Sequence, residues 1–242
     1  MERADLFFDL DRTLWDFDRN SREALGQIYA HHALDALPTP SSAPPSLPAF
    51  VAAYEAANDW CWGEYRAGRM SQEELRPRRF AMALEQMGVE TSAPGFASLS
   101  AQLGEDYVAL SPHLPHLMPG ALEVVRTLAG RGHRLFILTN GFSSVQHVKM
   151  EKSGLKPYFK AVIASDAVGF PKPDVRVFQA SLQQTGSTAE RAVMIGDDLH
   201  CDVVGARQAG WRQIHYNPEG QRHKEQIWRT ISHLNRLLDL PL

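Results

Sequence analysis

The order of apolar and polar positions divides the chain into two kinds of segment. From Pro119 onward, short apolar runs of strand length alternate with stretches in which apolar residues recur at helical spacing. Another apolar run, at residues 5–10, lies near the N-terminus, and residues 20–112 show only helical spacing and loops. Strands that alternate with helices predict right-handed crossovers and a parallel sheet covered on both faces.

The predicted fold class is therefore α/β, with a Rossmann-like, doubly wound parallel sheet as the core and an inserted all-helical domain. The core is expected to comprise residues 1–18 and 115–242, and the insert residues 19–114. Ser71, with Glu74 three residues later, predicts a capping box at the start of one helix of the insert. Five prolines within residues 38–48 predict a loop, because proline disrupts a helix interior. The expected strands are residues 5–10, 134–138, 161–164, 192–195 and 211–215, and a helix over residues 224–238 is expected to close the chain.

Composition narrows the class of protein. Hydrophobic residues make up 44% of the 242 residues and charged residues 22%, which is typical of a folded soluble protein. The net charge of −3 predicts no basic face for a nucleic acid polymer. No apolar run reaches the roughly 18 residues of a membrane span, and the N-terminal apolar stretch is too short for a signal peptide. A cytoplasmic protein is therefore expected, with no membrane partner.

The ten histidines do not predict a zinc site. His31-His32 and the pair His113 and His116 lack the closed nitrogen and sulfur ligand spacing of structural zinc sites. The two cysteines, Cys61 and Cys201, do not complete such a set, and they are too few for a disulfide-stapled mini-protein.

Reactive side chains follow the predicted strands at the points where they end. In open α/β sheets, ligands bind outside the carboxyl ends of the strands, so these positions predict the site. Each segment carries a carboxylate, a hydroxyl or an ammonium, and the side chains concerned are Asp9, Asp11, Thr139, Lys172, Asp197, Asp198 and Asp202.

These segments, in this order, resemble the four motifs of the haloacid dehalogenase-like (HAD) hydrolase superfamily. The motifs are Asp9-Leu10-Asp11-Arg12-Thr13, then Thr139, then Lys172, then the acidic segment 196–202. The helical insert matches the position of the family's C1 cap. The position after Asp11 is often glycine in the family, so the side chain of Arg12 is expected to point away or to contact substrate. The chain is also similar to the pyrimidine 5′-nucleotidase group within this family. The similarity lies in residues 11–17, 139–142 and 154–159, together with Gln146.

The resemblance implies roles for the two early aspartates and a metal ion. Asp9 is expected to be the nucleophile that forms an aspartyl-phosphate. Asp11 is expected to protonate the leaving oxygen and then to act as the general base for water. Mg²⁺ is the implied cofactor, held by the carboxylates of Asp9 and Asp197 and by the backbone carbonyl of Asp11. The family pattern selects Asp197 over Asp198, a choice that the spacing alone leaves open.

The remaining residues of the motifs are expected to bind phosphate and to support the loops. Thr139, the backbone of Asn140 and Lys172 are expected to hold the phosphoryl oxygens, with Lys172 acting as a point charge. Thr13 is expected to hold the first loop in place. Asp202 is expected to orient the metal ligands by contacting them without binding the metal itself.

The implied function is that of a Mg²⁺-dependent phosphomonoesterase for pyrimidine nucleoside 5′-monophosphates. Its partner is a small-molecule phosphomonoester, and no obligate protein partner is indicated. Alternatives are a sugar-phosphate or phosphoglycolate-type phosphatase, a phosphomutase and a 2-haloacid dehalogenase. Asp11 argues against the dehalogenase, whose relatives lack the second aspartate. A non-catalytic binding protein on the same scaffold is disfavoured because Asp9, Asp11, Thr139, Lys172 and Asp197 are all present.

Overall fold

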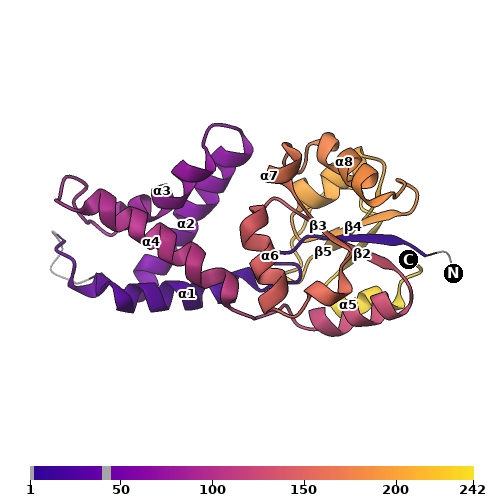
Figure 1. The fold of residues 1–242 in the computed structure, drawn as a ribbon, viewed down its shortest axis with the longest axis horizontal. Coiled ribbons are helices and arrows are strands. Elements are labelled where there is room, and N and C mark those ends of the chain that lie inside the picture. The colour runs from indigo at the N-terminus through magenta and orange to yellow at the C-terminus, as the bar shows by residue number, and fades with distance from the viewer. Residues whose placement is uncertain (1–2, 40–44) are drawn as a thin grey trace. The chain divides into compact units, whose positions relative to one another are not determined.

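The computed structural model describes residues 3–39 and 45–242. Residues 40–44, within the proline-rich segment predicted as a loop, lie outside the described residues, as do residues 1–2. The chain divides into two units (Figure 1): unit 1 comprises Met1–Asp18 and Pro112–Leu242, and unit 2 comprises Arg19–Ser111. The role of unit 2 as a cap stays a prediction.

Unit 1 is built on a parallel sheet, which confirms the predicted fold class. Within the described residues the sheet has six strands in the order β3-β2-β1-β4-β5-β6, and every neighbouring pair is parallel. The chain runs outward from β1 through β2 to β3, then returns to β4 on the other side of β1. The order therefore reverses at β1, which is where an open α/β sheet binds its ligands. The strands are β1 (Asp5–Phe8), β2 (Arg134–Thr139), β3 (Ala161–Ala164), β4 (Ala192–Gly196), β5 (Arg212–Tyr216) and β6 (Arg229–Ile231).

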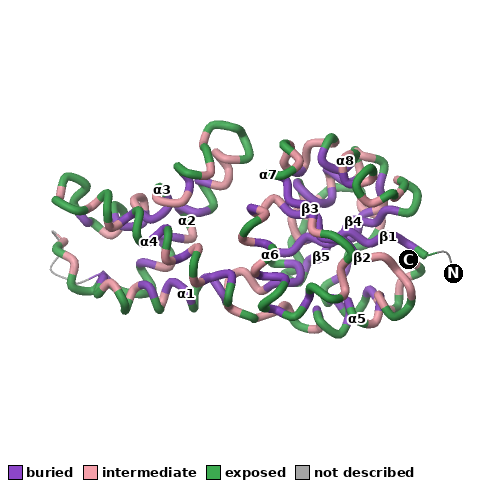
Figure 2. Tube along the Cα trace, in the orientation of Figure 1, coloured by how far each residue is buried: buried purple, intermediate pink, exposed green. Residues whose placement is uncertain are grey.

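Alternate side chains of the central strands pack on opposite faces of the sheet. In β1, Leu6 and Phe8 join the apolar cluster that includes helix α5 (Ala121–Gly130), and Phe7 joins the cluster that includes helix α8 (Val175–Thr185). The two helices lie on opposite sides of the sheet (Figure 1). Strands β1 and β4 are buried along their length, as is β2 after Arg134 (Figure 2). Burial of each such side chain contributes about 1.5–3 kcal/mol, so both faces stabilise the sheet. The other helices of unit 1 are α6 (Ser143–Lys152), α7 (Ser165–Val168), a π-helical turn (Leu199–Val204) and α9 (Gly205–Gln208).

The predicted closing helix at residues 224–238 is wrong. In its place, β6 extends the sheet beside β5, and a 3₁₀-helix follows at Leu234–Asp239. Ile231, Leu234 and Leu237 are all buried against the core. Apolar residues three positions apart also fit one face of an α-helix. The sequence pattern alone therefore does not distinguish an α-helix from the observed strand and 3₁₀-helix. Pairing with the open edge of β5 satisfies the backbone of this segment and so selects the strand.

Unit 2 contains long helices that pack through aromatic side chains. The predicted capping box is confirmed: the backbone amide of Glu74 donates to Ser71 Oγ, and the backbone amide of Ser71 donates to the Glu74 carboxylate. Tyr54 packs on Phe80 with ring centroids 4.9 Å apart. Within residues 3–39 and 45–242, no helix has both the length and the apolar character needed to cross a membrane. The helices are α1 (Phe17–His31), whose first two residues belong to unit 1, α2 (Leu47–Arg66), α3 (Gln72–Gln86) and α4 (Phe96–Leu110).

A buried ion pair anchors the first strand. Asp5 is fully buried, and its carboxylate accepts hydrogen bonds from Arg134 at 2.5 and 2.7 Å and from Ser187 at 2.5 Å. Burial raises the pKa of Asp5, but the hydrogen bonds from Arg134 and Ser187 outweigh it and hold the pKa below its ordinary value. The folded state therefore favours the charged form. This stabilisation is complete above the ordinary aspartate pKa and is lost as the pH falls through the lowered value.

We expect the variant Asp5→Asn to lose about 2–3 kcal/mol of unfolding free energy at pH 7, because it leaves the Arg134 guanidinium without its counter-charge. The loss should shrink as the pH is lowered to 3. Urea unfolding at both pH values measures it. Asp239→Asn is the control: that carboxylate is exposed and its pairing with Arg236 is long, at 3.7 Å, so its change should stay below about 0.5 kcal/mol. Equal stability of Asp5→Asn and wild type at pH 7 would contradict the assignment.

Candidate active site

Strands β1, β2 and β4 end at the same edge of the sheet and deliver the predicted side chains there. Phe8 is in register with Ile137 of β2 and Ile195 of β4. The backbone amide of Asp9 donates to the carbonyl of Ile195 at 2.8 Å, which fixes the start of the first loop. Asp9 and Thr139 are both buried. The parallel sheet thus brings together residues that are remote in the sequence.

Lys172 lies at the centre of this edge, with 2% of its side chain exposed. Its Nζ donates to Asp9 Oδ1 at 2.6 Å and to Asp202 Oδ1 at 2.6 Å. A third hydrogen bond goes to the carbonyl of Leu138 at 2.8 Å, so all three ammonium protons have acceptors. The lysine therefore joins the end of β1, the end of β2 and the turn after β4.

The side chain of Asn140 holds the backbone of Lys172. Asn140 Nδ2 donates to the Lys172 carbonyl at 2.9 Å, and the Lys172 amide donates to Asn140 Oδ1 at 2.7 Å. This two-point contact fixes the loop that carries the lysine. Sequence reasoning assigned only the backbone of Asn140, so the role of its amide side chain is an addition from the structure.

The acidic segment after β4 folds so that two of its aspartates face different partners. Asp202 Oδ2 accepts from the Asp198 amide at 3.1 Å, and this oxygen would lie 2.0 Å from a Cβ at position 196, so Gly196 is required there. Asp198 Oδ1 caps the π-helical turn by accepting from the amides of His200 at 2.9 Å and Cys201 at 2.8 Å. The Asp198 carboxylate is thus engaged in a cap.

Asp197 is tied to the first loop. Thr13 Oγ1 donates to Asp197 Oδ1 at 2.8 Å and accepts from the Asp197 amide at 3.1 Å. Nε2 of His215, on β5, lies 3.1 Å from the Asp197 carbonyl oxygen. The expectation that Thr13 holds the first loop has this reciprocal contact in its favour.

Three carboxylates meet beside the lysine, two of them buried and that of Asp197 half-buried. Oxygens of Asp9, Asp197 and Asp202 lie within 4.8 Å of one another. Burial raises the pKa of each of these groups to about 7, and the mutual repulsion of the carboxylates adds to the effect. Burial alone would lower the pKa of Lys172, but Asp202 and Asp9 outweigh it and raise that pKa above its ordinary value. One ammonium does not balance three carboxylates, and such a set of hard oxygen donors suits Mg²⁺.

The carboxylate of Asp11 contacts helix α6. Lys149 Nζ donates to Asp11 Oδ1 at 2.6 Å, and Gln146 Nε2 donates to Asp11 Oδ2 at 3.1 Å. The Lys149 ammonium also lies 4.2 Å from the centroid of the Trp15 ring, a cation–π distance. A Cβ at position 141 would lie 1.6 Å from Gln146 Nε2, so Gly141 makes room for this contact.

Sequence reasoning assigned no role to Lys149. The signal that could have found it is its position three residues after Gln146, which places two polar side chains on one face of a helix. Both side chains are buried.

Arg12 adopts a left-handed backbone conformation, with φ of 60°. This explains why glycine suits the position. Its guanidinium pairs with Asp18 at 2.9 Å and lies 4.7 Å from the centroid of the Phe17 ring. Those contacts anchor the side chain to the start of α1.

The predicted site residues therefore fall into two groups. The first group is the cluster formed by Asp9, Lys172, Asp197 and Asp202. Thr13 is bound to Asp197. The side chains of Asp11, Thr139 and Asn140 border this cluster with other partners: Asp11 contacts Lys149, and Thr139 Oγ1 accepts from the Gly141 amide at 3.0 Å. The catalytic and phosphate-binding roles of all these residues stay predictions.

Comparison with known proteins identifies the family. A model of the haloacid dehalogenase-like hydrolases matches residues 6–210, most of the chain. The chain belongs to the haloacid dehalogenase-like hydrolase family. The predicted resemblance is confirmed, as is the prediction that the chain is an enzyme of the hydrolase class.

Similar proteins include two pyrimidine 5′-nucleotidases. YjjG of Escherichia coli is 30% identical over 97% of this chain and 96% of its own. PynA of Streptococcus pneumoniae is 31% identical over 93% of this chain and 88% of its own. Among solved structures, the HAD-hydrolase YfnB of Bacillus subtilis, crystallised with bound magnesium, has a TM-score of 0.83 at 27% identity over 98% of both chains.

We expect Lys172→Met to be destabilised by about 2–4 kcal/mol at pH 8 without divalent metal, because it leaves Asp9 and Asp202 as uncompensated buried charges. Adding Asp202→Asn should restore part of that loss, since the repulsion is then reduced. Urea unfolding of the single and double variants measures both effects. A Lys172→Met protein as stable as wild type would show that the ammonium does not hold the cluster together.

Proposed function

We propose that this HAD-family hydrolase is a Mg²⁺-dependent phosphomonoesterase that acts on pyrimidine nucleoside 5′-monophosphates through an aspartyl-phosphate. The observation that carries the proposal is the buried contact between Lys172 and Asp9, inside a cluster of three carboxylates. An ammonium at this position neutralises the nucleophile and can also attract a phosphoryl oxygen. We expect the reaction to take place in the cytoplasm.

In the first step, a carboxylate oxygen of Asp9 attacks phosphorus. A bond forms between Asp9 and phosphorus while the bond from phosphorus to the ester oxygen breaks. The leaving oxygen takes a proton from Asp11, which starts as the acid. The remaining phosphoryl oxygens are proposed to be bound by Thr139, the backbone of Asn140 and Lys172.

In the second step, water attacks the phosphorus of the aspartyl-phosphate. Asp11, now a carboxylate, accepts the proton of that water, and the bond from Asp9 to phosphorus breaks to release inorganic phosphate. The contacts of Lys149 and Gln146 support this second role, because both donate to the Asp11 carboxylate. The acid role in the first step rests on the family resemblance.

The groups proposed to hold Mg²⁺ are the carboxylates of Asp9 and Asp197 and the backbone carbonyl of Asp11. Bound there, the ion would reduce the repulsion between the anionic nucleophile and the phosphate dianion. Asp198 is engaged as a helix cap, which favours Asp197 as the ligand. Asp202 is assigned to orienting Lys172 rather than to the metal, because its two oxygens accept from the Lys172 ammonium and the Asp198 amide.

The substrate class rests on the similarity to YjjG and PynA, which extends over both units. Unit 2 is assigned the role of the cap, and a cap selects the leaving group. The phosphatase and phosphomutase alternatives share the attack on phosphorus and differ in the leaving group or in the final acceptor of the phosphoryl group. A 2-haloacid dehalogenase would instead attack carbon and would need no metal. A substrate panel therefore separates them.

The purified protein is expected to release inorganic phosphate from UMP and dTMP in the presence of Mg²⁺, and EDTA should abolish the release. Asp9→Asn should lower turnover by about 1,000-fold or more, because the amide is a poor nucleophile. Asp239→Asn is the matched acid-to-amide control and should keep full activity. The assay measures free phosphate over a panel that includes sugar phosphates and phosphoglycolate, and it measures halide release from a 2-haloacid.

Each departure from this result has a defined meaning. Full activity in Asp9→Asn would refute the aspartyl-phosphate route. Turnover of the 2-haloacid that persists in EDTA would support the dehalogenase instead. Preference for phosphoglycolate or a sugar phosphate would overturn the substrate class while leaving the chemistry in place.

A further inference from the structure

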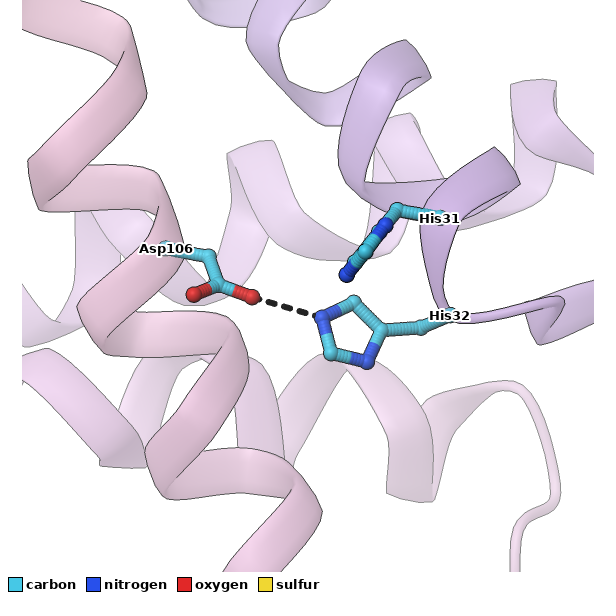
Figure 3. A group of neighbouring side chains, drawn as sticks. All are labelled: His31, His32 and Asp106. Carbon is cyan, nitrogen blue, oxygen red and sulfur yellow. Dashed lines mark hydrogen bonds and ion pairs between the residues drawn. The ribbon is translucent and has the colours of Figure 1, made fainter.

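A second group of metal-ligating side chains lies in unit 2, outside the site described above. His31 is the last residue of α1, His32 follows it, and Asp106 lies on α4 (Figure 3). One potential ligand atom from each side chain lies within 4.8 Å of the others. The set offers two imidazole nitrogens and one carboxylate oxygen, so its chemistry differs from the all-carboxylate cluster beside Lys172.

The three side chains face one another. His32 Nε2 lies 2.6 Å from Asp106 Oδ2. The rings of His31 and His32 are nearly perpendicular, with an angle of 88° and centroids 4.9 Å apart. Figure 3 shows a ring nitrogen of His31 turned toward the His32 nitrogen and the Asp106 carboxylate. No large rearrangement of the backbone is needed to bring these atoms around one ion.

The carboxylate is oriented by a neighbour on its own helix. Gln102, one turn earlier on α4, donates from Nε2 to Asp106 Oδ1 at 2.9 Å. Oδ2 is left facing the histidines. A hydrogen bond behind a ligating group is the usual support of a metal site.

An open surface pocket adjoins the cluster. It has a volume of about 510 Å³, and its lining within unit 2 includes His31 and Asp106 together with Gln27, Ile28, Ala109 and Leu110. This space can hold the water molecules that complete the coordination of an ion with three protein ligands.

We propose that His31, His32 and Asp106 bind a divalent transition-metal cation, with Zn²⁺ as the best match. Two imidazoles and one carboxylate, with a further position left to water, form a known donor set for zinc. Mg²⁺ prefers oxygen ligands, so the two clusters of this chain select different metals. Ligands about 2.1 Å from a tetrahedral ion stand about 3.4 Å apart, which small rotations of these side chains achieve. The bound ion would link the end of α1 to α4.

The competing explanation is that His32 and Asp106 form an ion pair and nothing more. His31 separates the two readings, because its side chain is exposed and the ion pair does not include it. Changing His31 therefore removes a metal ligand and leaves the pair intact. The spacing along the chain gave no sign of the site, since Asp106 lies 74 positions after His32.

The test is a titration of the tag-free, full-length protein with ZnCl₂ in an isothermal titration calorimeter. Excess Mg²⁺ in the buffer is included to occupy the all-carboxylate cluster beside Lys172. Wild type is expected to bind one more Zn²⁺ per chain than the double variant His31→Gln/His32→Gln. His31→Gln and Asp106→Asn should each weaken binding by about tenfold or more. His233→Gln, an exposed histidine in unit 1, is the matched control and should bind as wild type does.

The melting temperature gives a second readout that does not depend on catalysis. Zn²⁺ should raise the melting temperature of wild type and of His233→Gln more than that of His31→Gln, because a ligand that binds the folded state stabilises it. The proposal is overturned if His31→Gln binds Zn²⁺ with unchanged affinity and stoichiometry. It is also overturned if wild type binds no more Zn²⁺ than the double variant.

Discussion

The buried ammonium of Lys172 lies between the carboxylates of Asp9 and Asp202, and the whole strand-end site depends on this contact. Moving a charge out of water costs several kcal/mol per ion in a protein, so such an arrangement persists only where every hydrogen bond is made. Here all three protons of the lysine have acceptors within 2.8 Å. Four separate segments must meet for this to happen, and the parallel sheet is what places them at one edge.

The contact also explains why the surrounding residues have the identities they do. Gly196 leaves the space that the Asp202 side chain occupies, and Asn140 fixes the backbone on which the lysine is carried. Asp198 caps the next turn, so Asp197 is the carboxylate that faces Asp9. The cluster retains an excess of negative charge, which opposes folding and favours a divalent cation. The same excess is thus a cost in stability and the basis of the proposed chemistry.

Much of this could be predicted because it depends on local rules. The unbroken apolar run Leu6-Phe7-Phe8 indicated a buried strand, and the strand-end rule pointed to Asp9 and Asp197. The rest depends on tertiary contacts that a one-dimensional pattern does not carry. Residues 229–231 pair with an open strand edge, although their apolar spacing equally fits a helix. Lys149 reaches Asp11 from 138 positions away, and Asp106 reaches His32 from 74 positions away.

The central claim is that the charge of this cluster is completed by Mg²⁺ at Asp197 rather than at Asp198. Calorimetric titration of wild type, Asp197→Asn and Asp198→Asn with MgCl₂ tests it most directly, because both variants remove one negative charge. Asparagine keeps the acceptor oxygen that the cap at position 198 needs. The account predicts that Asp197→Asn loses detectable Mg²⁺ binding, while Asp198→Asn stays within about threefold of wild type. Equal loss in both variants, or full binding by Asp197→Asn, would contradict it.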